Sequence, residues 1–176
     1  MLINKCLPVY QFSEHHSIVI KGSKDQVYSH LLQADLRKGI MIKILLRLGG
    51  LPDDVYVIED LAGKMGFVKL AEHIGDEVVF GIVTNSPTFR SCSSNISSTD
   101  FFREPNPHLI KAVINFRVTE KNTLNQMVST ETRVWCANKS IRKRFGYYWF
   151  FIKPFSQMLR KEVLKELKKS FSQSHK

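Results

Sequence analysis

The chain has 176 residues, 43% of them hydrophobic, and carries a formal net charge of +10. This length suits one domain, residues 1–176, with a core large enough to fold alone, and the composition argues against a disordered chain. No apolar run approaches the roughly 20 residues of a membrane span, and the apolar run at the N-terminus is too short for a signal peptide.

The first part of the chain predicts one strand followed by two short helices. Residues 15–21 alternate in hydrophobicity, as a half-buried strand does. Ser23 and Gln26 form a capping box that opens a helix to about residue 33. Asp35 can cap a second helix, which ends before the glycine pair at 49–50. The apolar face of this second helix is assigned to Leu36, Ile40, Ile44, Leu45 and Leu48.

The middle of the chain predicts further strands. Residues 55–59 are a strand candidate, and two hairpins follow at residues 67–84 and 109–136, each with a polar turn between two apolar runs. The serine-rich residues 85–107 between the hairpins have the composition of a mobile loop. We treat this loop as part of the same domain, because the second hairpin needs the first to cover its apolar face.

The last fifth of the chain predicts one long helix over residues 138–171. Apolar side chains follow one another at steps of three or four from Phe145 to Phe171, which places them on one helical face. Asn138 is a suitable N-cap. Pro154 removes a helical hydrogen bond and disfavours helical geometry at Lys153, so we expect a kink or short break there.

The positive charge is concentrated in this helix. From residue 138 onward there are eleven Lys or Arg residues against two acids, which leaves nine of the ten net positive charges in this segment. The favoured interpretation is the solvated back of an amphipathic helix. The alternative is a patch for a lipid headgroup, a nucleic acid or an acidic protein, because cations are disfavoured at a helix N-terminus. This patch would comprise Lys139, Arg142, Lys143 and Arg144.

Motifs for catalysis and metal binding are missing from the sequence. It contains no GxSxG, no phosphate loop, no HExxH and no GxGxxG. His15 and His16 are adjacent in a predicted strand, so they point to opposite faces and cannot share a metal. Cys6, Cys92 and Cys136 are odd in number and lack CxxC spacing, which fits reduced thiols in a cytoplasmic protein. We therefore assign no catalytic residue, no metal ligand and no cofactor, and without a nucleic-acid-binding motif we regard nucleic acid as an unlikely partner.

Side chains of the second hairpin and the long helix are candidates for a ligand pocket. Strand alternation places Thr130 and Thr132 on the apolar face, while Arg117, Glu131 and Arg133 could form an ion network on the other face, contributing well under ~1 kcal/mol per pair. Buried hydroxyls usually bond to protein, and an aromatic stripe on a helix is usually core, so a filled interior is the competing interpretation. The candidate pocket residues are Ile114, Phe116, Thr130, Thr132, Val134, Phe145, Tyr148, Trp149, Ile152 and Phe155.

The order of these elements resembles the START-like superfamily, the helix-grip (SRPBCC) fold of pollen allergens, polyketide cyclases and lipid-transfer domains. The local sequence is similar to a bacterial branch without an assigned activity. The segments that carry the resemblance are FSEHHSI (12–18), NFRV (115–118), STETRV (129–134), RKRFGYYW (142–149) and KPFS (153–156). The resemblance implies an α+β fold in which a curved antiparallel sheet of about six or seven strands wraps around the C-terminal helix, enclosing a cavity.

Two functions of different classes are compatible with this resemblance, because the superfamily hosts carriers and enzymes on one scaffold. We favour binding or transport of a hydrophobic or amphipathic small molecule without a reaction, by a monomer or a homo-oligomer. The alternative is an enzyme of the cyclase or aromatase kind, which needs an ionisable residue in the cavity, with Glu72, Glu131 and Tyr148 as candidates. Burial of Glu131 in the cavity would favour the enzyme, and exposure beside Arg117 or Arg133 would favour the carrier.

Overall fold

The computed structural model describes residues 1–36, 39–48, 57–85, 98–103 and 109–174. Five antiparallel strands form one sheet in the order β1-β5-β4-β3-β2, which gives an α+β fold. The strands are β1 (Phe12–Lys21), β2 (Val68–His73), β3 (Glu77–Thr84), β4 (Ile110–Asn122) and β5 (Asn125–Cys136). The helices are α1 (Leu2–Cys6), α2 (Lys24–Gln33), α3 (Ile40–Leu48), α4 (Ile58–Lys64), α5 (Ser98–Phe102) and α6 (Lys139–Ser174).

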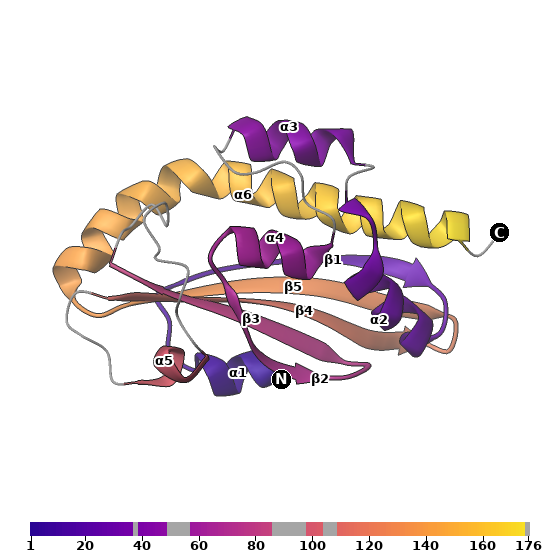
Figure 1. Ribbon diagram of the computed structural model, residues 1–176, viewed down its shortest axis with the longest axis horizontal. Helices are drawn as coiled ribbons and strands as arrows, with labels where there is room; N and C mark the ends of the chain where they lie inside the picture. The colour runs from indigo at the N-terminus through magenta and orange to yellow at the C-terminus, as the bar shows by residue number, and fades with distance from the viewer. Residues whose placement is uncertain (37–38, 49–56, 86–97, 104–108, 175–176) are drawn as a thin grey trace.

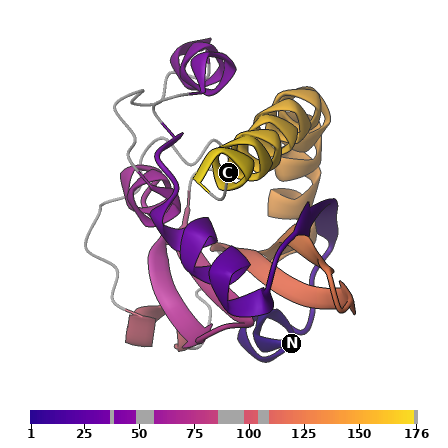
Figure 2. The same ribbon diagram turned by 90° about the vertical axis from the view of Figure 1, so that its right-hand side faces the viewer.

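Helices cover both faces of the sheet. Helix α6 runs along one face together with α2 and α4, and α3 packs on α6 on the side away from the sheet (Figure 1). Helices α1 and α5 contact the opposite face. Viewed from the end, the sheet bends towards α6 (Figure 2). We call the face towards α6 the inner face and the face towards α1 the outer face.

Each face of the sheet has its own apolar cluster. The inner cluster joins the sheet to α6, α2 and α4 and includes Phe80, Phe116 and Phe145. The outer cluster joins the sheet to α1 and α5 and includes Ile3 and Phe101. All eight residues of β3 are buried, because this strand is covered on both faces. Full burial of each large apolar side chain contributes roughly 1.5–3 kcal/mol.

Several local predictions are confirmed. The Ser23 hydroxyl accepts from the backbone N–H of Gln26, and the reciprocal bond completes the capping box of α2. Both hairpins form, as β2–β3 and β4–β5. The Oδ1 atom of Asn138 accepts from the backbone N–H of Ile141 at 2.9 Å, so Asn138 caps α6 as expected.

Other predictions are wrong. Residues 58–59, assigned to a strand, begin α4, and residues 55–56 lie outside the described part. The described residues form five strands, fewer than about six or seven. The buried side chains around α3 are Leu36, Ile42 and Leu46, whereas Ile40 and Ile44 are exposed. The run Ile40-Met41-Ile42-Lys43-Ile44-Leu45-Leu46 is apolar on nearly all sides, so its spacing does not define one face. The side chains of Leu45 and Leu48 lie outside the description.

The C-terminal helix continues through Pro154 without a break. It is one 36-residue helix that bends in its N-terminal half (Figure 1). Pro154 is exposed, so the Phe150 carbonyl that loses its partner lies on the hydrated side of the helix, where the loss is tolerated. In the predicted loop 85–107, residues 98–102 form α5, while 86–97 and 104–107 lie outside the described part.

Candidate functional site

Four polar side chains form a square on the inner face of the sheet. Strands β1 and β5 pair so that Glu14 lies opposite Thr132 and His16 lies opposite Thr130. Residues two apart on a strand share a face, and residues directly opposite have Cβ atoms about 5 Å apart. All four therefore face α6, on a surface formed largely by apolar side chains.

The two residues of β1 in this square bind each other. The Nε2 atom of His16 lies 2.6 Å from Oε1 of Glu14, and both side chains are largely buried. A carboxylate and an imidazole at this distance share a proton or a charge-assisted hydrogen bond. The pair is thus held in one orientation, with the second carboxylate oxygen left for another partner.

The side chain of Arg160 extends from α6 towards these four polar side chains. Its Nη1 donates to the Thr130 hydroxyl at 3.3 Å, its Nε donates to the Ser156 hydroxyl at 3.2 Å, and Nε lies 4.0 Å from Oε1 of Glu14. Burial lowers the pKa of Arg160 to about 10 by penalising the charged form, and the nearby Glu14 partly offsets this effect. We call Glu14, His16, Thr130, Thr132 and Arg160 the inner polar cluster.

The inner polar cluster has unused hydrogen-bonding capacity. Among the described residues, Oε2 of Glu14 and Oγ1 of Thr132 are buried without a hydrogen-bond partner. A buried polar atom left without a partner costs about 1–3 kcal/mol, so most are satisfied in folded proteins. The two atoms come from residues that lie opposite each other in the sheet, so one bound group could satisfy both.

An aromatic cluster borders the inner polar cluster. Phe12, two residues before Glu14 on the same face of β1, has its ring 5.0 Å from that of Phe145 and 5.9 Å from that of Trp149. Phe145 also lies 5.8 Å from Tyr148. These separations are typical of favourable aromatic pairs. The inner polar cluster therefore lies directly beside a group of aromatic side chains on the same face of the sheet.

The structure places the predicted pocket residues on the same side of the sheet as this cluster. Thr130 and Thr132 belong to it, and Ile152 is half-buried in α6. The other predicted residues pack in or against the inner apolar cluster: Ile114, Phe116, Val134, Phe145, Tyr148, Trp149 and Phe155.

Sequence reasoning missed Glu14, His16 and Arg160. The available signal was positional, because the two β1 residues occupy the same face as Phe12, Ile18 and Ile20, where an apolar residue is expected.

The predicted three-residue ion network on the outer face is wrong in one member. Glu131 and Arg133 form an ion pair at 2.7 Å, but Arg117 pairs with Asp76 at 3.7 Å. Glu131 therefore lies beside Arg133 and away from α6, with its side chain 14% exposed, which is neither burial in an inner cavity nor full exposure. Another candidate acid, Glu72, accepts from the Tyr28 hydroxyl.

The described part of the chain shows two absences. No group of three or more His, Cys, Asp or Glu residues there could hold a metal ion. No helix there is long and apolar enough to cross a membrane. The four cations of the predicted anionic-partner patch, Lys139, Arg142, Lys143 and Arg144, are all exposed near the start of α6.

Comparisons with known proteins leave the site to be interpreted from its own geometry. No family model matches the sequence, and no curated protein matches it. A crystal structure of a conserved protein from Geobacillus kaustophilus aligns with 93% of this chain and 97% of its own, with a TM-score of 0.37 and 14% sequence identity.

Proposed function

We propose that the protein binds a hydrophobic or amphipathic small molecule between the sheet and α6, with the polar end of the molecule at the inner polar cluster. The observation that carries this proposal is the pair of buried atoms without partners, Glu14 Oε2 and Thr132 Oγ1. A ligand group that bonds to both would remove a cost of about 1–3 kcal/mol for each atom.

The chemistry of the cluster narrows the ligand class. Arg160 and the Thr132 hydroxyl can donate to a ligand oxygen, whereas Glu14 Oε2, when ionised, accepts only. The polar end therefore carries an acceptor and a donor, as a hydroxyl group does. A multiply anionic end is disfavoured because Glu14 lies within the cluster. The apolar part of the ligand would pack on Phe12, Phe145 and Trp149.

The START-like resemblance of the sequence supports the same proposal, since that superfamily includes lipid-transfer domains. The arrangement of α6 along a bent antiparallel sheet is consistent with it. Because such scaffolds host unrelated activities, the proposal depends on the cluster and not on the resemblance.

A second candidate function is favoured by the Glu14–His16 pair. An imidazole 2.6 Å from a carboxylate is an arrangement used for general acid–base catalysis. In this alternative, the protein would be a cyclase- or aromatase-type enzyme, and His16 would move a proton on the bound substrate. His16→Gln would then abolish turnover while leaving binding within a few-fold of wild type.

Two fluorescent probes test the binding proposal: dehydroergosterol, with a hydroxyl end, and cis-parinaric acid, with a carboxylate end. We expect binding of the hydroxyl probe. Thr132→Val should weaken it about three- to tenfold, and Arg160→Met on the order of ten- to a hundredfold, as expected for one neutral and one charged hydrogen bond.

Thr119→Val is the matched control, because the Thr119 hydroxyl bonds to the Met127 carbonyl, away from the cluster. This substitution should leave probe affinity unchanged. Native mass spectrometry of the protein purified from cells provides an independent test. The proposal fails if neither probe binds and no small molecule co-purifies.

A further inference from the structure

The outward side of α6 carries bulky apolar side chains that the fold leaves exposed. Tyr147, Phe150 and Phe151 are 63%, 75% and 78% exposed, and Met158 is exposed further along. With Pro154, these residues recur at steps of three or four, so they form one stripe on the helix. We call Tyr147, Phe150, Phe151, Pro154 and Met158 the outer stripe. Exposed apolar groups of this size, gathered in one place, mark an interaction site.

Cations flank the outer stripe at both ends. Lys143 and Arg144 precede it and Lys161 follows it in the same helical row, and all three are exposed. Residues 132–161 contain no aspartate or glutamate. The surface of α6 in this region therefore combines exposed aromatic rings with an uncompensated positive charge, and it faces away from the sheet.

Helix α3 extends the same surface. It packs on α6 on the side away from the sheet, so the two helices are the elements farthest from the sheet on this side (Figures 1 and 2). Ile40, Met41 and Ile44 of α3 are exposed there. Seven of the fourteen exposed large hydrophobic residues in the described part of the chain lie on these two helices, which makes this the principal apolar surface.

We propose that α6 and α3 dock on an anionic membrane surface, with the outer stripe in the headgroup–acyl boundary and the flanking cations on lipid phosphates or carboxylates. A helix with an apolar side and a cationic rim lies parallel to the membrane plane, and aromatic rings favour this depth. This surface is distinct from the small-molecule site, and neither proposal requires the other.

The charge distribution and the side-chain types favour a membrane over other occupants. A second copy of the chain would bring two acid-free cationic rows together, which is repulsive. Single-stranded nucleic acid uses aromatic rings for stacking, but Ile40, Ile44 and Met158 offer no flat face to a base. Aliphatic and aromatic groups together match the acyl boundary of a bilayer.

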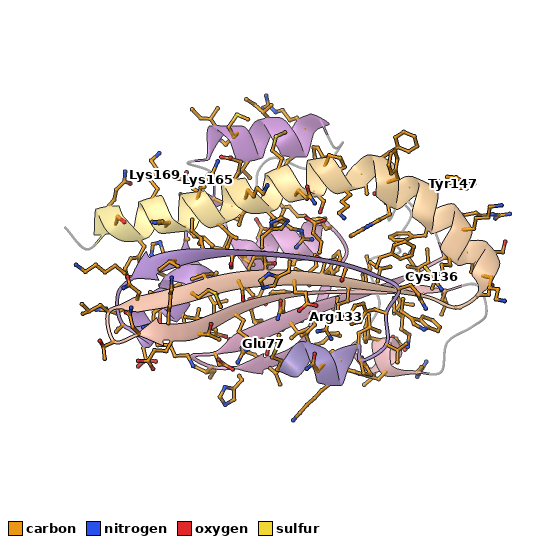
Figure 3. All side chains as sticks on the ribbon, turned by 180° about the vertical axis from the view of Figure 1, so that it is seen from behind. Glu77, Arg133, Cys136, Tyr147, Lys165 and Lys169 are labelled. Carbon is orange, nitrogen blue, oxygen red and sulfur yellow. The ribbon has the colours of Figure 1, made fainter. Side chains whose placement is uncertain are left out.

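Vesicle flotation tests the proposal with the full chain. Vesicles of phosphatidylcholine and phosphatidylserine in equal parts should bind the protein, and pure phosphatidylcholine vesicles should bind it far less. Replacing Arg142, Lys143 and Arg144 together by Gln should reduce partitioning on the order of a hundredfold, since each cation near the surface contributes about fivefold. The matched control replaces Lys165, Lys168 and Lys169, exposed cations in the last turns of α6, and should have a much smaller effect. Figure 3 shows Lys165 and Lys169 at this end of the helix.

The apolar part is tested separately. The double variant Phe150→Ser and Phe151→Ser should reduce partitioning at least tenfold without changing the melting temperature, because both side chains are exposed. Ile74→Ser with Leu124→Ser removes comparably exposed apolar groups from two turns and should have no effect. Equal binding to neutral and anionic vesicles, or binding that survives loss of both phenylalanines, would overturn the proposal. Dimerisation lost in the phenylalanine variant, without vesicle binding, would assign the surface to a second copy instead.

Discussion

Both faces of the sheet bury charged side chains, but the hydrogen bonding of Glu77 and Arg133 on the outer face differs from that of Glu14 on the inner face. On the outer face, Glu77 is fully buried and both of its carboxylate oxygens are used. They accept from the backbone N–H groups of Leu2 at 2.6 Å and Ile3 at 3.2 Å, and from the side chain of Asn115 at 2.7 Å. Glu77 thus holds the first turn of α1 against the sheet, where a negative charge is favourable.

Arg133 has a similar role on the outer face. It donates to Glu131 and to the Leu7 carbonyl, and its guanidinium lies 4.6 Å from the centre of the Tyr10 ring. Figure 3 shows Glu77 and Arg133 on the α1 side of the sheet. Both residues fasten the N-terminal segment, so structure alone explains the burial of these two charged groups.

The inner polar cluster leaves two buried atoms, Glu14 Oε2 and Thr132 Oγ1, without partners on residues that lie opposite each other. The other such atoms among the described residues, Gln126 Oε1 on the inner face and Arg117 Nε on the outer face, are outside this cluster. Comparison of the faces shows that burial of a charged residue is not by itself a sign of function. The informative property is hydrogen-bonding capacity that the fold does not use. The experiments below test this distinction.

The largest expected effect concerns the two glutamates. Glu77→Gln should reduce the free energy of unfolding by about 3 kcal/mol, because the new NH₂ group faces donors that need an acceptor. Glu14→Gln should cost less than Glu77→Gln, because the atom replaced can be the oxygen without a partner, and the remaining loss comes from removing the negative charge near the buried Arg160. Urea unfolding of both variants measures the difference. Equal losses would show that the two faces are not distinct.

Substitution of two glycines by alanine tests how tightly side chains pack on the outer face and between the sheet and α6. A Cβ on Gly81 would overlap Leu70 Cδ1 and lie 2.9 Å from Phe101 Cε2, so Gly81→Ala should cost about 1–3 kcal/mol. A Cβ on Gly146 of α6 would meet Phe12 Cζ at 3.7 Å, an ordinary contact. Gly146→Ala should therefore stabilise the helix by up to about 1 kcal/mol. Calorimetric melting would contradict this comparison if both variants were destabilised alike.

Elements with local signals were predictable from the sequence. The cap residues Ser23 and Asn138 each accept from an N–H group three residues away, and each hairpin pairs neighbouring segments. The alternation of apolar residues also placed Thr130 and Thr132 on the inner face correctly. The face of α3 was not predictable, because its sequence is apolar on nearly all sides.

The inner polar cluster depends on contacts distant in the sequence. Glu14 meets Thr132 only because β1 pairs with β5, and nothing near Glu14 specifies that register. Arg160 belongs to a helix rich in surface cations, so its charge gave no sign of burial. Chain-distant pairing and the rotation of α6 therefore decide the site, and neither can be derived from local pattern.

The pH dependence of stability that is due to the Cys136 thiol tests whether water is excluded from the inner face near the start of α6. Burial raises the pKa of Cys136 to about 11 from 9.0, with Arg142 opposing the shift. Between pH 9 and pH 11 the thiol is protonated in the folded chain but ionised in the unfolded chain. The free energy of unfolding therefore falls as the pH rises through this range. The loss is about 1 kcal/mol at pH 10 and is absent well below pH 9. Urea unfolding of Cys136→Ala should show a shallower pH slope, and an unchanged slope would indicate a hydrated thiol.

The smallest effect on stability is expected at Thr132. Thr132→Val keeps the shape of the side chain and removes a buried hydroxyl without a partner, so the free energy of unfolding should stay the same or rise by up to about 1 kcal/mol. Thr130→Val is the matched substitution on the same strand and face, and it should destabilise, because it removes the acceptor of the Arg160 guanidinium. If Thr132→Val instead destabilises as much as Thr130→Val, the Thr132 hydroxyl has a partner in solution. The Thr132 hydroxyl would then not be available to bind a ligand.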